Sequence, residues 1–310
     1  KMVFDGEVEA YNFPQGSLSH LTRHIASRSP GLLTKVGLGT FVDPRIEGGK
    51  LNSKSTEDLV KLVEFNGEEW LFYPAPKDDV AIIRGTLADE NGNITLDKEG
   101  VLLEQINIAH AAKACGGIVI AQVERIVKAG SLHPKSVKVP GVSVDYVVVS
   151  QPENHMQTIT TQFNAALCGD VRVPVNSLAP MALDERKVIA RRTALELKPG
   201  AITNLGIGIP AGVPSVAAEE GVADQFTLSV ESGITGGIPA QLGDFGTAYN
   251  ADAIIEQSLQ FDFYDGGGLD ASFLGLAQAD NHGNVNVSKF NGRPVGCCGF
   301  VNITRSTKNL

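Results

Sequence analysis

The sequence lacks the long apolar and basic runs that mark membrane and nucleic-acid-binding proteins. No apolar stretch reaches the roughly 18 residues that a membrane-spanning helix needs. No cluster of lysine and arginine stands out, and the formal net charge is -9 at pH 7, whereas nucleic-acid binders gather these cations against the phosphates. We therefore expect no membrane span and no nucleic-acid partner, and any anionic ligand must be held by local groups.

Cysteine is scarce, and neither a metal site nor a disulfide framework is indicated. The four cysteines show no CxxC spacing: Cys115, Cys168, Cys297 and Cys298. No secretory leader precedes them, which favours reduced thiols in a cytoplasmic protein, and we expect the vicinal pair Cys297-Cys298 to be packing residues. His20 and His24 stand four residues apart, but no carboxylate or third histidine repeats this spacing. We predict no metal and no permanently bound cofactor.

What the sequence does contain fits a globular protein of two domains. Its 310 residues exceed what one hydrophobic core usually organises, and 43% hydrophobic with 20% charged residues are ordinary values. Residues 174–183 are rich in proline, serine and asparagine, which is typical of a linker. We predict an N-terminal domain over residues 1–180 and a C-terminal domain over residues 184–310.

A duplicated motif supports the two-domain prediction. Residues 88–94 and 279–285 share the pattern A-D-x-x-G-N followed by a β-branched residue. Two further pairs follow in the same order: residues 36–41 with 205–210, and residues 117–120 with 299–302. Because self-similarity at a similar spacing is the signature of related units, we interpret the chain as two related domains in tandem.

Hydrophobic periodicity predicts α/β units in both halves. In the first half we expect helices over residues 17–28 and 103–114, strands over residues 32–36, 80–83, 118–121 and 146–149, and a hairpin around Asn66-Gly67. In the second half we expect helices over residues 184–197 and 213–220, and strands over residues 201–205, 226–230 and 300–304. Since the main strand segments are continuously apolar rather than alternating, we predict open, mostly parallel sheets that are covered on both faces.

One acidic residue stands where open α/β folds bind their ligands. Glu231 follows directly after the predicted strand 226–230, and Gly233, Gly236 and Gly237 come after it. Ligands of such folds bind at the carboxyl ends of the strands. Glycines remove side chains that would keep a bulky ligand away from the carboxylate. We therefore interpret Glu231 as a nucleophile.

The same unit permits a second interpretation. A glycine turn at residues 206–208, followed by a helix and by an acid at the end of the next strand, is similar to a dinucleotide-binding fingerprint in which Glu231 would hold a ribose. The third glycine, Gly212, comes one position late, however, and Pro210 replaces a backbone N–H that would help to bind pyrophosphate. An NAD(P)-dependent oxidoreductase is therefore kept as the alternative.

Five segments occur in the order found in one known family, and together they span the chain: residues 9–16, 34–45, 204–210, 231–237 and 261–268. On these segments the sequence resembles the family I coenzyme A transferases, most closely the acetate or propionate CoA-transferase branch. The resemblance implies two open-sheet α/β domains of the CoA-transferase or NagB-RpiA-like type, equivalent to α and β subunits fused in one chain. It further implies acyl-CoA and a short-chain carboxylate as substrates, and a homo-dimer or homo-tetramer.

The resemblance also implies roles for individual residues. Glu231 would attack the thioester and then carry CoA as a glutamyl thioester. The oxyanion and CoA contacts would come from Asn204, Leu205, Gly206, Ile207 and Gly208, with the Ile207 amide as the main donor. The carboxylate pocket would be lined by Gln15, Gly37, Leu38, Gly39, Gly233, Gly236, Gly237, Asp265, Gly266, Gly267 and Gly268. Candidate partners for the CoA phosphates are Lys35, Arg45 and Lys50.

Chains of the family extend further at both ends. We therefore expect the first domain to be truncated at its start and the second at its end, where a glycine-rich loop would complete the oxyanion hole. This leaves a third possibility beside the transferase and the oxidoreductase, namely a catalytically silent scaffold that binds CoA without turning it over.

Overall fold

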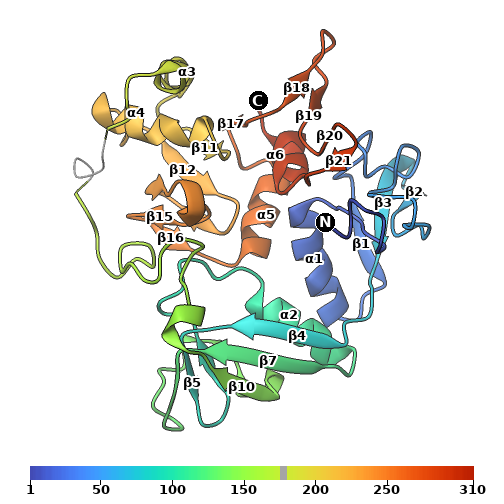
Figure 1. Ribbon diagram of the computed structural model, residues 1–310, viewed down its shortest axis with the longest axis vertical. Helices are drawn as coiled ribbons and strands as arrows, with labels where there is room; N and C mark the ends of the chain where they lie inside the picture. The colour runs from blue at the N-terminus through green and yellow to red at the C-terminus, as the bar shows by residue number, and fades with distance from the viewer. Residues whose placement is uncertain (175–179) are drawn as a thin grey trace.

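The computed structural model of the protein describes residues 1–174 and 180–310 and has an α/β fold (Figure 1). The predicted fold class is confirmed, because helices and strands follow one another in both halves and parallel strands form the central sheet of each half. In the part of the chain that the structure describes, no helix is long and apolar enough to cross a membrane. Residues 175–179 of the predicted linker lie outside the described residues, and the domain boundaries stay a prediction.

The first half builds three small sheets from ten strands. Its helices are α1 (Gln15–Ala26) and α2 (Gln105–Ala114), and its strands are β1 (Gly31–Thr34), β2 (Lys61–Phe65), β3 (Glu68–Pro74), β4 (Val80–Arg84), β5 (Leu87–Asp89), β6 (Ile94–Thr95), β7 (Ile118–Val123), β8 (Arg125–Val127), β9 (Val137–Val139) and β10 (Tyr146–Val149). Strands β10, β7 and β4 form a parallel sheet in that order, β1-β3-β2 is antiparallel, and β8-β5-β6-β9 is mixed. The predicted hairpin at Asn66-Gly67 joins β2 to β3.

The parallel sheet of the first half is covered on one face only. Ala81 and Ile83 point from β4 into a core shared with α2. Their neighbours Val80 and Ile82 point the other way, because successive side chains of a strand alternate between faces, and Ile82 is 74% exposed. The prediction that these strands are buried on both sides is therefore wrong for the described residues: a run of apolar residues fixes the strand, but it does not supply a second covering layer.

The second half carries a five-stranded sheet in the order β16-β13-β12-β11-β17, of which β12, β11 and β17 are parallel. Its helices are α3 (Glu185–Ala194), α4 (Val213–Glu219), α5 (Gln257–Asp265) and α6 (Phe300–Ser306). Its strands are β11 (Ile202–Leu205), β12 (Thr227–Val230), β13 (Ile234–Thr235), β14 (Ile238–Pro239), β15 (Ala248–Tyr249), β16 (Ala253–Ile254), β17 (Ala271–Phe273), β18 (Gln278–Ala279), β19 (Val285–Asn286), β20 (Lys289–Phe290) and β21 (Arg293–Pro294).

Helices cover both faces of this second sheet. Leu205 of β11 and Leu228 of β12 pack with α3 and α4 on one face. Ile202 of β11 packs with α5 and α6 on the other. Helix α1 of the first half packs against both α2 and α5, so that it joins the two halves, as Figure 1 shows.

The duplicated motif folds into the same loop twice. Asp89 and Asp280 each accept hydrogen bonds from two backbone amides and from the side chain of the asparagine four residues later, at 2.7–3.0 Å. Residues 36–41 and 205–210 both lie where the chain turns after a strand, β1 and β11. The third proposed pair does not lie in matching elements. Residues 117–120 lead into strand β7, whereas residues 299–302 begin helix α6.

Residues 300–304 form a helix and not the predicted strand. A short apolar run fits either a strand or a buried helix. Here Val301, Asn302 and Ile303 are consecutive buried residues, because α6 lies against both α5 and α1. Packing against neighbouring helices thus determines that this segment is helical, which the local sequence pattern does not.

Candidate active site

The position of Glu231 follows from the pleat of the second sheet. Asn204 of β11 and Ser229 of β12 are register partners in the parallel pair, so their side chains lie on the same face of the sheet, toward α5. Glu231 comes two residues after Ser229 and continues the same alternation as the first residue beyond β12. The sequence thus brings a carboxylate and a carboxamide together at the carboxyl edge of the sheet.

Glu231 has weak polar support. The side-chain amide of Asn204 donates to its Oε2 over a long 3.5 Å, and in the described part of the chain Glu231 forms no ion pair. Burial raises the pKa of the Glu231 carboxyl, and hydrogen bonds from the backbone and from Asn204 offset only part of this rise. An ionised carboxylate here is therefore poorly solvated, which makes it a stronger base and a better nucleophile than one in water.

The carboxylate reaches a cavity of about 420 Å³ between the two halves. Five residues that the sequence predicted for the site meet there: Gln15, Asn204, Gly206, Ile207 and Glu231. Gln15 begins α1, and its backbone N–H donates to the backbone carbonyl of Cys298 at 2.9 Å. This bond holds the start of α1 against the cavity wall. The Ile207 amide donates to no partner within the described residues, so it is open to receive an oxyanion.

Other predicted residues lie outside this cavity. Leu205 is buried in the core with α3 and α4 on the opposite face, and Gly208 faces open space at φ +89°. Gly37, Leu38 and Gly39 line a neighbouring cavity of about 620 Å³, which shares Val287 and Phe300 with the first.

The glycines after Glu231 serve backbone packing and do not line the cavity. A Cβ at Gly233 would stand 2.1 Å from the Ile255 carbonyl oxygen, and one at Gly237 would stand 2.2 Å from that of Tyr249. A Cβ at Gly236 would meet the Asp252 carboxylate at 2.1 Å. The interpretation that they make room for a ligand is corrected accordingly: chain segments fill that room.

The segment from Asp265 to Gly268 supports the site from behind. Asp265 accepts two hydrogen bonds from the Asn302 amide nitrogen at 3.1 and 3.0 Å, and Asn302 accepts one from the Gly16 amide at 3.0 Å. Gly266 and Gly267 close α5, and a Cβ at Gly268 would strike the Phe263 ring at 2.2 Å. These residues connect α5, α6 and α1 next to Gln15 and do not line the cavity.

The three candidate cations are already paired. Lys35 bonds Glu68 at 2.8 Å, Arg45 bonds Asp43 at 2.7 Å, and Lys50 bonds Asp58 at 2.6 Å. Of these, Lys35 lines the 620 Å³ cavity. Among the described residues, no group of three or more histidine, cysteine, aspartate or glutamate side chains could hold a metal ion.

A turn at residues 296–299, for which no role was predicted, forms part of the cavity wall beside Glu231. Cys298 lines the cavity with φ +47° between Gly296 and Gly299, and burial together with the Glu231 charge raises the pKa of its thiol. Cys297 behaves as predicted and packs with Val36 and Val301. The G-C-C-G pattern was visible in the sequence, but nothing local showed that it would face Glu231. Phe245 and Gly246 also line the cavity, and no sequence motif pointed to them.

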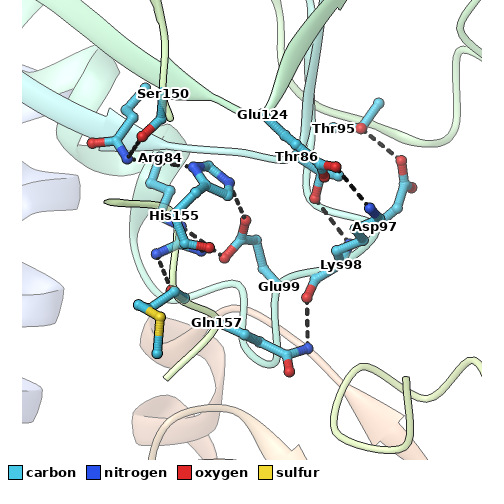
Figure 2. Close-up of polar contacts among 12 residues, drawn as sticks. Arg84, Thr86, Thr95, Asp97, Lys98, Glu99, Glu124, Ser150, His155 and Gln157 are labelled. Carbon is cyan, nitrogen blue, oxygen red and sulfur yellow. Dashed lines mark hydrogen bonds and ion pairs between the residues drawn. The ribbon is translucent and has the colours of Figure 1, made fainter. Parts of the chain in front are cut away.

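A second polar cluster lies at the carboxyl edge of the first sheet (Figure 2). Arg84, the last residue of β4, pairs through Nε with Glu99 at 3.0 Å, and the other Glu99 oxygen is 3.5 Å from Nε2 of His155. Arg84 also donates to the carbonyl of Met156. Burial raises the pKa of Glu99, but Arg84 opposes this rise. The cluster encloses only about 130 Å³.

Comparisons with known proteins find CoA-transferases among the similar sequences. Residues 1–150 match the family model described as Coenzyme A transferase. The chain is 53% identical over 303 residues to "Caffeate CoA-transferase" of Acetobacterium woodii, covering 96% of this chain and 58% of that protein. It is 44% identical over 310 residues to "Acetate CoA-transferase YdiF" of Escherichia coli K12, covering 100% and 58%.

Solved structures show the same fold. The apoenzyme of acyl-CoA transferase YdiF from Escherichia coli O157:H7 superposes with a TM-score of 0.91 at 43% identity, covering 99% of this chain and 57% of that one. A thioester complex of that protein with CoA superposes with a TM-score of 0.90 over the same shares. The chain thus spans somewhat more than half the length of the relatives it matches.

Proposed function

Because the chain belongs to the coenzyme A transferase family, we propose that it transfers CoA between a short-chain acyl-CoA and a carboxylic acid through a covalent thioester on Glu231. The observation that carries the proposal is a partly buried, desolvated glutamate, without a cationic partner among the described residues, that faces a cavity of about 420 Å³. The solved relative in a thioester complex with CoA supports it.

The first half-reaction transfers CoA from the donor acyl group to the Glu231 carboxyl group. A Glu231 oxygen attacks the thioester carbonyl, the C–S bond breaks, and CoA leaves as a thiolate from the mixed anhydride. The thiolate then attacks the glutamyl carbonyl, the donor acid leaves as a carboxylate, and CoA remains on Glu231 as a thioester. An acceptor carboxylate runs the same steps in reverse and regenerates the Glu231 carboxylate. Bonds and charges balance without water, metal or nucleotide.

Each attack creates an oxyanion that needs a donor. The free Ile207 amide lines the same cavity as Glu231 and is the donor we assign to it; loss of one such donor typically costs about 3 kcal/mol in the barrier. The Leu274, Phe300 and Ile303 side chains contribute apolar wall. An enclosed apolar wall keeps water from the anhydride, whose hydrolysis would otherwise compete with transfer.

Two-substrate kinetics test the proposed reaction. Initial rates measured over a grid of acyl-CoA and acid concentrations should give parallel double-reciprocal lines, because the first product leaves before the second substrate reacts. Intersecting lines would contradict a covalent enzyme form. The same assay with acetate, propionate, butyrate and a hydroxycinnamate ranks the acceptor acids, and we expect the small acids to give the higher kcat/KM.

The dinucleotide-dependent oxidoreductase is not favoured. The relatives at 44–53% identity are CoA transferases, and Glu231 lies against Asn204 and Gly299 at the bottom of a cavity. NADH fluorescence should not change on mixing with the protein. A silent CoA-binding scaffold would bind CoA yet show no turnover, so the kinetic grid separates it as well.

We also propose that the protein is a cytoplasmic homo-oligomer. Its four cysteines are unpaired, as is usual in a reducing compartment. Light scattering coupled to size-exclusion chromatography measures the assembly, and a monomer at micromolar concentration would contradict this proposal.

A further inference from the structure

Tyr264 lies directly behind the Asn204 side chain, on the side away from the cavity. It comes from the last turn of α5 and is 1% exposed. Its hydroxyl is 3.2 Å from the Asn204 amide nitrogen and 2.7 Å from the Ser229 hydroxyl. Burial raises the pKa of Tyr264 and the Glu231 charge adds to this rise, so the phenol stays protonated. The residue lies inside the segment 261–268 that carried the family resemblance, but no role was predicted for it.

The Asn204 amide nitrogen has more acceptors than hydrogens. Its two hydrogens face three oxygens: the Ser229 carbonyl at 3.2 Å, the Tyr264 hydroxyl at 3.2 Å and the Glu231 carboxylate at 3.5 Å. The side-chain orientation is settled by chemistry, since a carbonyl and a carboxylate can only accept, and the nitrogen must therefore face them. The buried Oδ1 of Asn204 has no partner among the described residues.

We infer that Tyr264 is a positioning residue for Glu231: its hydroxyl competes for an Asn204 amide hydrogen and so keeps the glutamate weakly hydrogen-bonded. The Ser229 carbonyl and the Tyr264 hydroxyl are the nearer acceptors, so the Asn204 hydrogens bond mainly to them. The hydrogen bond to the Glu231 carboxylate is the longest and weakest of the three. A hydrogen bond to the charged form stabilises a carboxylate and lowers its basicity. The tyrosine thus preserves the reactivity of Glu231 without touching it.

Few other groups can influence the charge of Glu231. Cys297 and Cys298 are the remaining titratable residues that line the cavity, within the described residues. Burial raises the pKa of Cys297 to about 12 and also raises that of Cys298. Both thiols are therefore uncharged at neutral pH. The hydrogen bonds that lower the pKa of Glu231 come from a backbone amide and from the Asn204 amide, which Tyr264 shares.

The chain provides a matched control for Tyr264→Phe. Tyr73 is also 1% exposed, and its hydroxyl donates to the Val36 carbonyl at 3.1 Å, but it does not line the Glu231 cavity. Tyr73→Phe therefore removes one buried phenol hydroxyl from the other half. Ser229→Ala perturbs the same polar cluster while it leaves the Tyr264 oxygen in place as an acceptor.

Carbon-13 NMR titration of protein labelled at the glutamate Cδ measures the inference without any substrate. The Glu231 resonance is assigned by its loss in Glu231→Gln. In Tyr264→Phe the freed Asn204 hydrogen turns to the carboxylate, and we expect the Glu231 midpoint to fall by about half a pH unit. Tyr73→Phe should leave it unchanged, and Ser229→Ala should not lower it. An unchanged or higher midpoint in Tyr264→Phe overturns the inference.

The kinetic consequence rests on the proposed function. Above the acid limb of the pH profile, glutamyl-CoA formation should slow by about two- to threefold in Tyr264→Phe, because a carboxylate that is less basic by half a pH unit is a weaker nucleophile. The acid limb should shift to lower pH together with the NMR midpoint. If wild-type protein forms no glutamyl-CoA, the proposed function fails while the NMR shift still decides the role of Tyr264. If the adduct forms and the midpoint does not move, only this inference fails.

Discussion

Two glutamates lie at the carboxyl edges of the two parallel sheets, and they differ in their partners. Glu99 faces the guanidinium of Arg84 and the ring of His155 (Figure 2). Glu231 faces the neutral amide of Asn204 and a cavity. Burial raises the pKa of both carboxyls. A glutamate at the edge of one sheet therefore holds chain segments together, whereas the glutamate at the edge of the other is available for reaction.

The comparison teaches that burial alone does not make a nucleophile. A charged partner opposes the desolvation of Glu99, and the guanidinium also anchors the chain at Met156 and His155 through their carbonyls. Both Glu99 oxygens face cationic or imidazole nitrogens, and the cavity beside them is less than a third the volume of the one at Glu231. At Glu231 the missing cation, the long amide contact and the open volume occur together, and this combination is what supports covalent catalysis.

The largest expected effect comes from removing the carboxylate that has no cation. Glu231→Gln keeps the size of the side chain and its bond with Asn204, but an amide cannot form the anhydride. We expect turnover to fall by at least about a thousandfold. Glu99→Gln, the matched change at the other edge, should retain activity per folded molecule within about threefold. Comparable losses in both variants, measured by CoA transfer between acyl-CoA and acetate, would remove the distinction.

The next effect concerns stability, where we expect the larger loss at the Glu99 cluster and the smaller one at Glu231. Arg84→Met leaves Glu99 buried without its cation and removes the donors to Met156 and His155. We expect a loss of about 3 kcal/mol in the free energy of unfolding, at the lower end of the range for buried pairs because Arg84 is partly exposed. Glu231→Gln should cost less than about 0.5 kcal/mol at neutral pH or stabilise the fold. Urea unfolding followed by circular dichroism measures both, and a stability loss that is larger in Glu231→Gln would contradict the account.

The pH dependence of stability sharpens the comparison further. The folded-state pKa of Glu231 lies above its ordinary value of 4.5, so between the two values the folded chain binds more protons than the unfolded chain. The free energy of unfolding contributed by Glu231 therefore falls as pH rises through this window. Glu231→Gln does not titrate there, and its stability relative to wild type should increase from pH 4.5 upward. A difference that is constant between pH 4.5 and 8 would show that Glu231 is not desolvated.

The smallest effect is expected at the exposed rim of the Glu99 cluster. Lys98 pairs with Glu124 at 2.9 Å, and both side chains are more than one third exposed. Solvent screens such a pair, so Lys98→Ala should change the free energy of unfolding by less than about 1 kcal/mol. A loss as large as that of Arg84→Met would mean that the whole cluster, and not the buried pair, carries the stability of this edge.

Much of the fold could be predicted from local pattern. The strand, glycine turn, helix and strand that end in Glu231 were predicted at β-α-β spacing, and the structure has β11, α4 and β12 there. The Asx-type loops at Asp89 and Asp280 were found as a repeat. Helix α6 and the exposed face of the first parallel sheet were not predicted. Both depend on which elements pack against a segment and not on the sequence of the segment itself.

The candidate site divides in the same way. Glu231 could be found because it stands at a strand end, where chain direction alone brings side chains together. Asn204 and Ile207 were expected from the family resemblance, and both line the same cavity as Glu231. The glycines at 233, 236 and 237 were misread, since a sequence does not show whether a missing side chain makes room for a ligand or for backbone. Cys298 and Tyr264 come from elements whose approach to Glu231 is set by tertiary packing.

Peptide-resolved mass spectrometry after acyl-CoA treatment tests the central claim most directly. The protein is mixed with acyl-CoA, reduced with borohydride and digested, and the peptides that carry Glu231 and Glu99 are compared in the same sample. We expect the Glu231 peptide to carry CoA in a sample taken before reduction and to contain the corresponding alcohol after reduction. The Glu99 peptide should stay unmodified in both. Modification of the Glu99 peptide to a similar extent, or an unmodified Glu231 peptide under conditions of active CoA transfer, would contradict it.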